Sequence, residues 1–129
     1  MLLQTTSSCV SSFVQRAGIA AIKGDQTPVD VMMVEYKSRR DLLVNGLNAI
    51  PGITCHTPGG AFYAFPNISR FGLTSEEFAE RMLEKADVAL LPGSNFGSQG
   101  EGFVRLVYAS GRENIEKALE RIAFACKKL

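Results

Sequence analysis

Apolar side chains recur every three or four positions in four stretches of this chain, a spacing that gathers them on one helix face. We therefore predict amphipathic helices over residues 8–23, 28–49, 75–86 and 111–126. A helix as long as 28–49 usually bridges two bodies or lies along one. The expected apolar stripes contain Val10, Phe13, Val14, Ala17 and Ala21 in the first helix, and Met32, Tyr36, Leu43, Leu47 and Ile50 in the second.

Short side chains that can accept a hydrogen bond from the first helical turn precede each of these segments. The expected N-caps are Ser7 or Ser8, Thr27 followed by Pro28, Thr74 with Glu77, and Ser110 with Glu113, the last two as capping boxes. Gly24 is the expected C-terminal cap of the first helix. These signals fix where we expect each helix to begin.

Apolar runs flanked by proline and glycine lie between the helices, a pattern typical of buried strands. We predict strands at residues 53–55 and 61–65, in the run that begins at Val88, and over residues 103–108. The order is then helix, helix, strand, strand, helix, strand, strand, helix. This order predicts an α/β or α+β fold in which helices pack on a small mixed or antiparallel sheet.

Arg105 is an unusual residue for a strand. Alternation puts it with Phe103 and Val107 on one face, and puts Val104, Leu106 and Tyr108 on the other. A charge between apolar neighbours is unfavourable unless it is paired, and the planar fork of arginine suits a carboxylate. One hypothesis is that Arg105 binds an anionic group of a small ligand. The other is an edge-strand arginine that reaches water or pairs with a nearby glutamate.

The turn Thr57-Pro-Gly-Gly60 precedes two aromatic residues. Its glycines suit a backbone that bends tightly or lets another group come close. In the strand that follows, Phe62 and Tyr63 should point to opposite faces, so that one aromatic ring faces the core and the other a cleft. The alternative is that both rings pack as structure.

Composition limits the classes of function. The chain has 129 residues, of which 46% are hydrophobic, and a net charge of +1, with basic and acidic residues mixed along the chain. We expect one globular domain with a real core, and neither nucleic acid nor an anionic membrane as a partner. No apolar run approaches the roughly 18 residues of a membrane span, and the first residues lack the pattern of a signal peptide.

The cysteines and the histidine do not suggest a metal or catalytic site. Cys9, Cys55 and Cys126 have no CxxC spacing, so we expect small buried side chains in a reducing compartment such as the cytoplasm. The single histidine, His56, has no second ligand nearby in the sequence, and Cys55 beside it should point to the opposite strand face.

Five ordered segments resemble parts of class I/II aminotransferases, which depend on pyridoxal 5′-phosphate. Pro58-Gly-Gly-Ala-Phe-Tyr63 is similar to the family's P-x-G-A-F-Y signature, and Leu91-Pro-Gly-Ser-Asn-Phe-Gly97 to its PGxxFG loop. Gly102-Phe-Val-Arg-Leu106 is similar to its G-x-x-R-[LI] strand. The segments Tyr36-Lys-Ser-Arg-Arg-Asp-Leu42 and Ser12-Phe-Val-Gln-Arg-Ala17 resemble the long bridging helix and the helix before it.

The resemblance implies a set of substrate-binding residues. Arg105 matches the arginine that binds the substrate α-carboxylate, and Phe62 matches the aromatic residue that faces the substrate cleft. Gly60 lies on the turn beside Phe62. Asn95, with Phe96 and Gly97, matches a loop that shapes the cleft.

The resemblance also implies that parts of such an enzyme are missing. The lysine that forms a Schiff base with the cofactor lies, in the family, upstream of residue 1 in an S-x-[ST]-K context that no lysine of this chain has. We expect no catalytic residue, no bound cofactor and no metal in this chain. Residues 1–27 would end the cofactor domain, and residues 28–129 would form the C-terminal small domain, with 28–49 as its bridging helix.

These implications leave three hypotheses open. The chain is the C-terminal segment of an aminotransferase that binds an amino acid or 2-oxo acid, and we then expect a homodimer. Alternatively, it is a stand-alone small-anion-binding domain without catalysis. The third hypothesis is a dimerisation module, in which the first two helices bury their apolar faces against another copy. The sequence does not distinguish among aspartate, alanine and aromatic amino acids as substrates.

Overall fold

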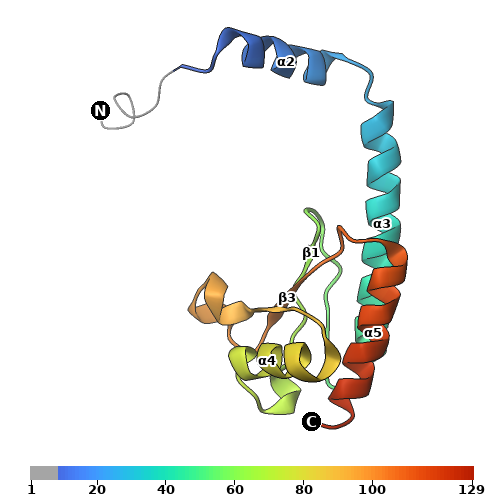
Figure 1. Cartoon of the computed structure of the whole chain (residues 1–129), viewed down its shortest axis with the longest axis vertical. Coiled ribbons are helices and arrows are strands. Elements are labelled where there is room, and N and C mark those ends of the chain that lie inside the picture. The colour runs from blue at the N-terminus through green and yellow to red at the C-terminus, as the bar shows by residue number, and fades with distance from the viewer. Residues whose placement is uncertain (1–8) are drawn as a thin grey trace. The chain divides into compact units, whose positions relative to one another are not determined.

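A computed structural model of the chain describes residues 9–129, which form helices and a small antiparallel sheet (Figure 1). The α-helices in this range are α2 (Ser12–Lys23), α3 (Thr27–Asn48), α4 (Ser75–Ala86) and α5 (Arg112–Cys126). The strands are β1 (Tyr63–Ala64), β2 (Leu91–Pro92) and β3 (Val104–Val107), and short 3₁₀ helices are η1 (Ser69–Phe71), η2 (Gly93–Phe96) and η3 (Ser98–Gly100). The predicted α/β class is confirmed.

The chain divides into two compact units, Met1–Met33 and Val34–Leu129, and the boundary falls inside α3. The first unit, described from residue 9, contains α2 and the start of α3. No residue of α2 is buried, and its predicted apolar face is exposed, with Phe13 74% and Val14 46% exposed. The second unit contains the sheet, α4, α5 and the rest of α3.

The helix ends agree with the predictions to different degrees. Thr74 and Glu77 form the predicted capping box at α4. The predicted box of Ser110 and Glu113 is wrong, because the carbonyl of Gly111 accepts the first helical bonds, from the amides of Asn114 and Ile115. Ser110 instead accepts a hydrogen bond from the Asn114 side chain.

The first two helices also begin differently from the prediction. α2 starts at Ser12 after Ser11, and the predicted caps Ser7 and Ser8 lie outside the described residues. Gly24 follows α2 as expected, and its amide donates to the Ala20 carbonyl. Thr27 is the first helical residue of α3 rather than its cap, and the side chain of Asp25 accepts hydrogen bonds from its amide and its hydroxyl.

The strands are shorter than the apolar runs that predicted them. The predicted strand over 53–55 is a single bridge between Thr54 and Asn67, and the strand over 61–65 is reduced to β1. The run that begins at Val88 forms only β2. Chain turns shorten them, because Ala61 before β1 has a positive φ of 58° and η2 begins directly after β2.

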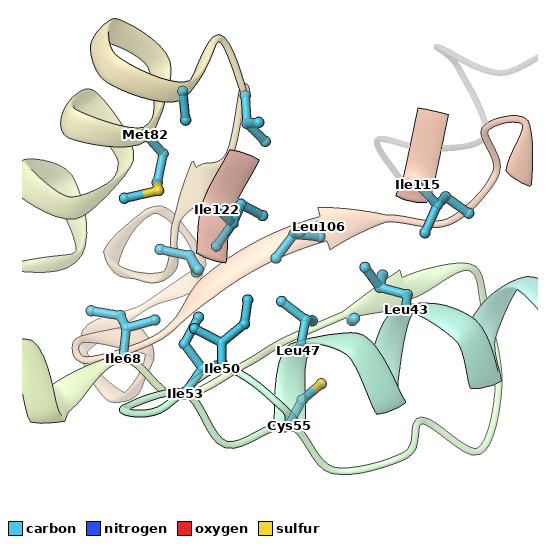
Figure 2. Packing of buried hydrophobic residues seen from close by; sticks show 14 of the residues in the cluster. Leu43, Leu47, Ile50, Ile53, Cys55, Ile68, Met82, Leu106, Ile115 and Ile122 are labelled. Atoms are coloured by element: carbon cyan, nitrogen blue, oxygen red, sulfur yellow. The ribbon is translucent and has the colours of Figure 1, made fainter. Parts of the chain in front are cut away.

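The core of the second unit lies between one face of the sheet and three helices. Val104, Leu106 and Tyr108 on and after β3 are buried, as the alternation predicted. Figure 2 shows side chains of α3, α4 and α5 in one apolar cluster with Leu106 of β3. They include Leu43 and Leu47 from α3, Met82 from α4, and Ile115 and Ile122 from α5. Burial of this apolar surface is the main stabilising contribution to the fold.

Candidate functional site

Arg105 lies on β3, which is the central strand of the sheet. The strand order is β1-β3-β2, with Leu91 of β2 paired with Arg105 and Tyr63 of β1 paired with Val107. The edge-strand alternative for Arg105 is therefore wrong. The side chain of Arg105 is half-buried on the sheet face opposite the core.

Two aromatic rings contact the guanidinium of Arg105. Its Cζ atom lies 4.5 Å from the centroid of the Tyr63 ring and 4.3 Å from that of the Phe96 ring. The negative ring faces attract the cation without neutralising its charge. Tyr63 is within reach because it is a diagonal cross-strand neighbour of Arg105.

Arg105 has no counter-ion among residues 9–129. The ion pairs in this range join other residues, and the buried Nε of Arg105 has no hydrogen-bond partner there. The predicted alternative of a glutamate partner is therefore not met within the described residues. A half-buried guanidinium with an unused donor favours an anion, since an unmade hydrogen bond at a buried polar group is unfavourable.

The sheet face around Arg105 is rich in exposed aromatic residues. The Phe65 ring stacks on Phe103 at 5.4 Å and meets Phe96 edge-on at 6.1 Å. On the other side of Tyr63, the Phe62 ring lies 4.6 Å away. We call this surface the aromatic face and define it by Tyr63, Phe65, Phe96, Phe103 and Arg105. Exposed apolar surface around one cation is typical of a binding site.

The two aromatic residues after the glycine turn do not divide between core and cleft. Phe62 is 39% exposed and Tyr63 36%, so the prediction that one of them faces the core is wrong. Ala64 takes the buried position of β1 instead. Alternation places Phe62 on the side of Ala64, where its ring stacks on that of Tyr36 of α3 at 6.3 Å but stays exposed at the edge of the core.

Buried Tyr108 holds the end of the glycine turn. Its hydroxyl donates to the Ala61 carbonyl at 2.9 Å, and its amide donates to the Phe62 carbonyl at 3.0 Å. Burial raises the pKa of Tyr108, so the phenol stays protonated and remains a donor. These bonds fix the Ala61 backbone at φ 58° and thereby the position from which the Phe62 ring projects.

The loop from Gly93 to Gly100 carries Asn95 and Phe96. Its two ends approach so closely that a Cβ on Gly93 would collide with the Gly100 carbonyl, and one on Gly100 with the Gly93 carbonyl. The Gly93 amide donates to the Phe103 carbonyl at 2.9 Å, and the Phe103 amide to the Gly100 carbonyl at 3.1 Å. The close approach of Gly93 and Gly100 and the hydrogen bonds with Phe103 hold the loop beside Arg105.

The structure brings together only some of the residues that the sequence predicted. Phe96 contacts Arg105 directly, and Phe62 contacts Tyr63, which in turn contacts Arg105. Gly60 lies on the exposed turn, with open space around it, and Asn95 is an exposed neighbour of Phe96. Sequence reasoning missed Tyr63 as a contact of Arg105, because that contact depends on the strand register, which only the β1–β3 pairing reveals.

A hollow of about 260 Å³ is lined in part by Arg105 but by none of the aromatic rings that surround its guanidinium. Apolar residues of α3, α5 and the sheet line most of it, with Arg105, Ser110 and Asn114 as polar members. None of the rings of the aromatic face lines this hollow. Arg105 therefore borders both the aromatic face and this hollow.

Other site types have little support within residues 9–129. No three His, Cys, Asp or Glu side chains in this range are placed to hold a metal ion. The helices of the same range include none with the length and hydropathy needed to cross a membrane. Cys55 is buried and Cys126 half-buried, but Cys9 is exposed, so the expectation of burial is wrong for Cys9.

Comparison with known proteins gives one consistent family. Residues 1–122 match the family model described as aminotransferase class I and II. The chain is 48% identical to an aspartate aminotransferase of Pyrococcus horikoshii, over 88% of this chain and 29% of that protein. It is 40% identical to the aromatic-amino-acid aminotransferase 2 of Thermococcus litoralis, over 95% of this chain and 32% of that protein.

A solved structure agrees with this match. The aspartate aminotransferase from Rhizobium meliloti superposes with a TM-score of 0.89 at 38% identity, and the match covers 99% of this chain and 34% of that one. The chain thus spans about a third of the length of the relatives that it matches.

Proposed function

Because the chain belongs to the class I and II aminotransferase family, we propose that it is the C-terminal segment of a pyridoxal-phosphate-dependent aminotransferase, and that Arg105 binds the carboxylate of its amino acid or 2-oxo acid substrate. The observation that carries the proposal is the guanidinium of Arg105, which two aromatic rings contact and no acidic residue within 9–129 pairs. A planar fork of donors is suited to bidentate carboxylate binding.

The surrounding rings favour carboxylate binding because they restrict the arginine side chain and exclude water from it. Contact with Tyr63 and Phe96 restricts the long side chain, so less conformational entropy is lost when an anion binds. The rings also exclude water from part of the guanidinium, and a charge pair is stronger where water is excluded. The carboxylate is thereby oriented for reaction at its α-carbon, which is a contribution of positioning.

The other substrate-binding residues lie at the border of the aromatic face. We propose that Phe62 covers the bound substrate with its ring and that Gly60 leaves room for the substrate to approach. Asn95 offers an amide from the loop beside Phe96. The exposure of all three supports a role toward a ligand that approaches this face.

The cofactor would be held elsewhere in the whole protein. Pyridoxal phosphate, when bound, supplies the electron sink for amino-group transfer. No lysine of this chain lies on β1, β3 or η2, which surround Arg105, so the described residues do not fit a Schiff-base site there. We propose that residues 1–27 end the cofactor domain, that residues 28–129 form the small domain, and that this chain alone does not catalyse transamination.

A second function is favoured by one observation. α2 exposes large apolar residues, with Phe13 74% and Ile22 80% exposed, which supports a stand-alone module that dimerises through this helix. A non-catalytic anion-binding domain would keep Arg105 in the same role. Both alternatives lack the amino-group transfer chemistry.

Thermal unfolding with added carboxylates tests the carboxylate site. A ligand that binds only the folded chain raises its Tm, so succinate, 2-oxoglutarate or an amino acid should do so in the wild type. Arg105→Ala should abolish the rise, and Arg105→Lys should reduce it because the bidentate fork is lost. Arg70→Ala, which removes an exposed arginine on η1, is the matched control and should keep the rise. No rise in the wild type would overturn the carboxylate site.

A labelling experiment tests the catalytic proposal. After incubation with pyridoxal phosphate and reduction with borohydride, mass spectrometry should find no single lysine modified in stoichiometric amount. A stoichiometric adduct at one lysine would contradict the proposal that this chain alone lacks the Schiff-base lysine and does not catalyse transamination.

A further inference from the structure

The loop that carries Phe96 is tied to the start of α4 by a buried serine. Ser75, the first residue of α4, is 0% exposed. Its hydroxyl oxygen lies 3.1 Å from the hydroxyl oxygen of Ser94, and it accepts a hydrogen bond from the Ser94 amide at 3.4 Å. Ser94 is the second residue of η2, only two positions before Phe96.

The carboxylate of Glu101 completes the connection from the other end of the loop. It accepts hydrogen bonds from the Ser75 amide at 2.7 Å and the Ser75 hydroxyl at 3.0 Å. It also accepts one from the Gly102 amide at 3.1 Å. The bonds from Ser75 lower the pKa of Glu101, so the group is ionised at neutral pH. Both ends of the 93–100 loop are thus joined to one residue of α4.

The hydrogen bonds of Ser75 and Glu101 are linked to Arg105 through the Phe96 ring. Phe96 lies inside the tied loop, and its ring centroid is 4.3 Å from the Arg105 Cζ atom. The side chain of Phe96 is 48% exposed, so burial in the core does not hold it in place. Its position over the guanidinium therefore depends on the backbone of the loop, which Ser75 and Glu101 hold from outside the site.

We propose that Glu101 and Ser75 are positioning residues that hold the Phe96 ring on the guanidinium of Arg105 and thereby set the affinity of the anion site. The effect on affinity rests on the proposed carboxylate function, whereas the effect on the ring does not. Neither residue touches Arg105 in the described contacts, so each acts through the loop.

Glu77 provides a matched control for Glu101. Glu77 lies in the first turn of α4, and like Glu101 it accepts hydrogen bonds from a backbone amide and a hydroxyl, in this case both of Thr74. Its pKa is lowered for the same kind of reason. Glu77 bonds to Thr74 and not to the 93–100 loop, so it separates helix stability from loop position.

The experiment measures the proton resonances of the Arg105 side chain in the 129-residue chain by NMR. Ring currents from Tyr63 and Phe96 should shift the Arg105 Hδ signals away from those of exposed Arg70. Glu101→Gln and Ser75→Ala should move the Arg105 signals toward the Arg70 values, because the Phe96 ring leaves the guanidinium. Glu77→Gln should lower Tm yet leave the Arg105 signals in place. Ser94→Ala replaces an exposed residue and removes only the hydroxyl that contacts Ser75. It should move the Arg105 signals in the same direction, and it serves as the test if Glu101→Gln and Ser75→Ala fail to fold.

A carboxylate titration of the same samples gives the second readout. Loss of one aromatic contact should weaken binding by about three- to tenfold in Glu101→Gln and leave Glu77→Gln unchanged. Unchanged Arg105 signals in Glu101→Gln and Ser94→Ala, or equal changes in Glu77→Gln, would overturn the positioning role. A wild-type chain that binds no carboxylate would overturn the proposed function, while the NMR signals would still decide the role of Glu101 and Ser75.

Discussion

At the scale of single residues, the site depends on a charge that the described residues leave without a counter-ion. Aromatic side chains, and not an acidic side chain, contact the guanidinium of Arg105, and its buried Nε has no hydrogen-bond partner among the described residues. Rings stabilise a guanidinium more weakly than a carboxylate does, and they do not block a carboxylate from binding. This choice of neighbours favours a ligand site over a structural ion pair.

Ala61 gives a prediction at this scale. Its φ of 58° lies in the left-handed region, which is unfavourable for a residue with a Cβ but not for glycine. Ala61→Gly should therefore stabilise the chain by about 0.5–1 kcal/mol, measured as the free energy of unfolding in urea. Gly59→Ala, on the same exposed turn without a positive φ and with open space around the added Cβ, should not destabilise the chain, so the preference for glycine is specific to position 61. A destabilised Ala61→Gly variant would contradict the assignment of strain to this position.

The thiols give a second prediction. Burial raises the pKa of Cys126 to about 11 and raises that of Cys55, whereas Cys9 is exposed. Only the thiolate reacts with a disulfide reagent, so Cys9 should react fast at pH 8 and the other two slowly. Kinetics with Ellman's reagent should show one fast thiol, which Cys9→Ser removes. Three equally fast thiols would show that the second unit opens readily.

At the scale of elements, the sequence predicted helices better than strands. The periodic stripes and the Thr74–Glu77 box are local signals, and α4 begins and ends where they indicated. β1 and β2 have two residues each, too few for alternation to define them. The contact between Tyr63 and Arg105 could not be predicted, because it depends on which residues of β1 and β3 pair.

The two carboxylates that bond to residues at the start of α4 give a prediction about how Tm depends on pH. Hydrogen bonds lower the pKa of Glu77 and of Glu101 below the ordinary value of 4.5 in the folded chain. Their contribution to stability is therefore present above about pH 4.5 and is lost as the pH falls through the lowered values. Tm measured from pH 7 to pH 3 should fall in the wild type below this point.

The double variant Glu77→Gln/Glu101→Gln isolates this effect. It should have a lower Tm at pH 7 and a shallower fall of Tm in acid, because neither position can bind a proton. Asp25, whose pKa is lowered by its bonds from Thr27, remains in both proteins and gives both the same background. Parallel acid curves for the two proteins would contradict the assigned role of these carboxylates.

At the scale of the whole molecule, the chain corresponds to about a third of the aspartate and aromatic-amino-acid aminotransferases compared above. The second unit has a core of its own, built from α3, α4, α5 and the sheet. α2 in the first unit has no buried residue, although its apolar face was predicted from the sequence. An amphipathic helix with an uncovered face is suited to pack against another body.

Sedimentation tests how this face behaves. Exposed Phe13 and Ile22 should make the 129-residue chain self-associate at micromolar concentrations, as expected of a homodimer. The double variant Phe13→Ser/Ile22→Ser should shift the chain toward monomer, and Val107→Ser, an exposed change on β3, should not. A wild-type chain that is a clean monomer would count against association through α2.

The central claim is that Arg105 binds a carboxylate, and an NMR titration of its side chain tests that claim most directly. With ¹⁵N-labelled chain, 2-oxoglutarate should shift the Arg105 Nε–H signal to saturation and leave that of Arg70 in place. An uncharged diamide of the same size should cause no shift, because it offers no carboxylate to the guanidinium. An Arg105 signal that does not move with 2-oxoglutarate, or that moves equally with the diamide, would contradict the account.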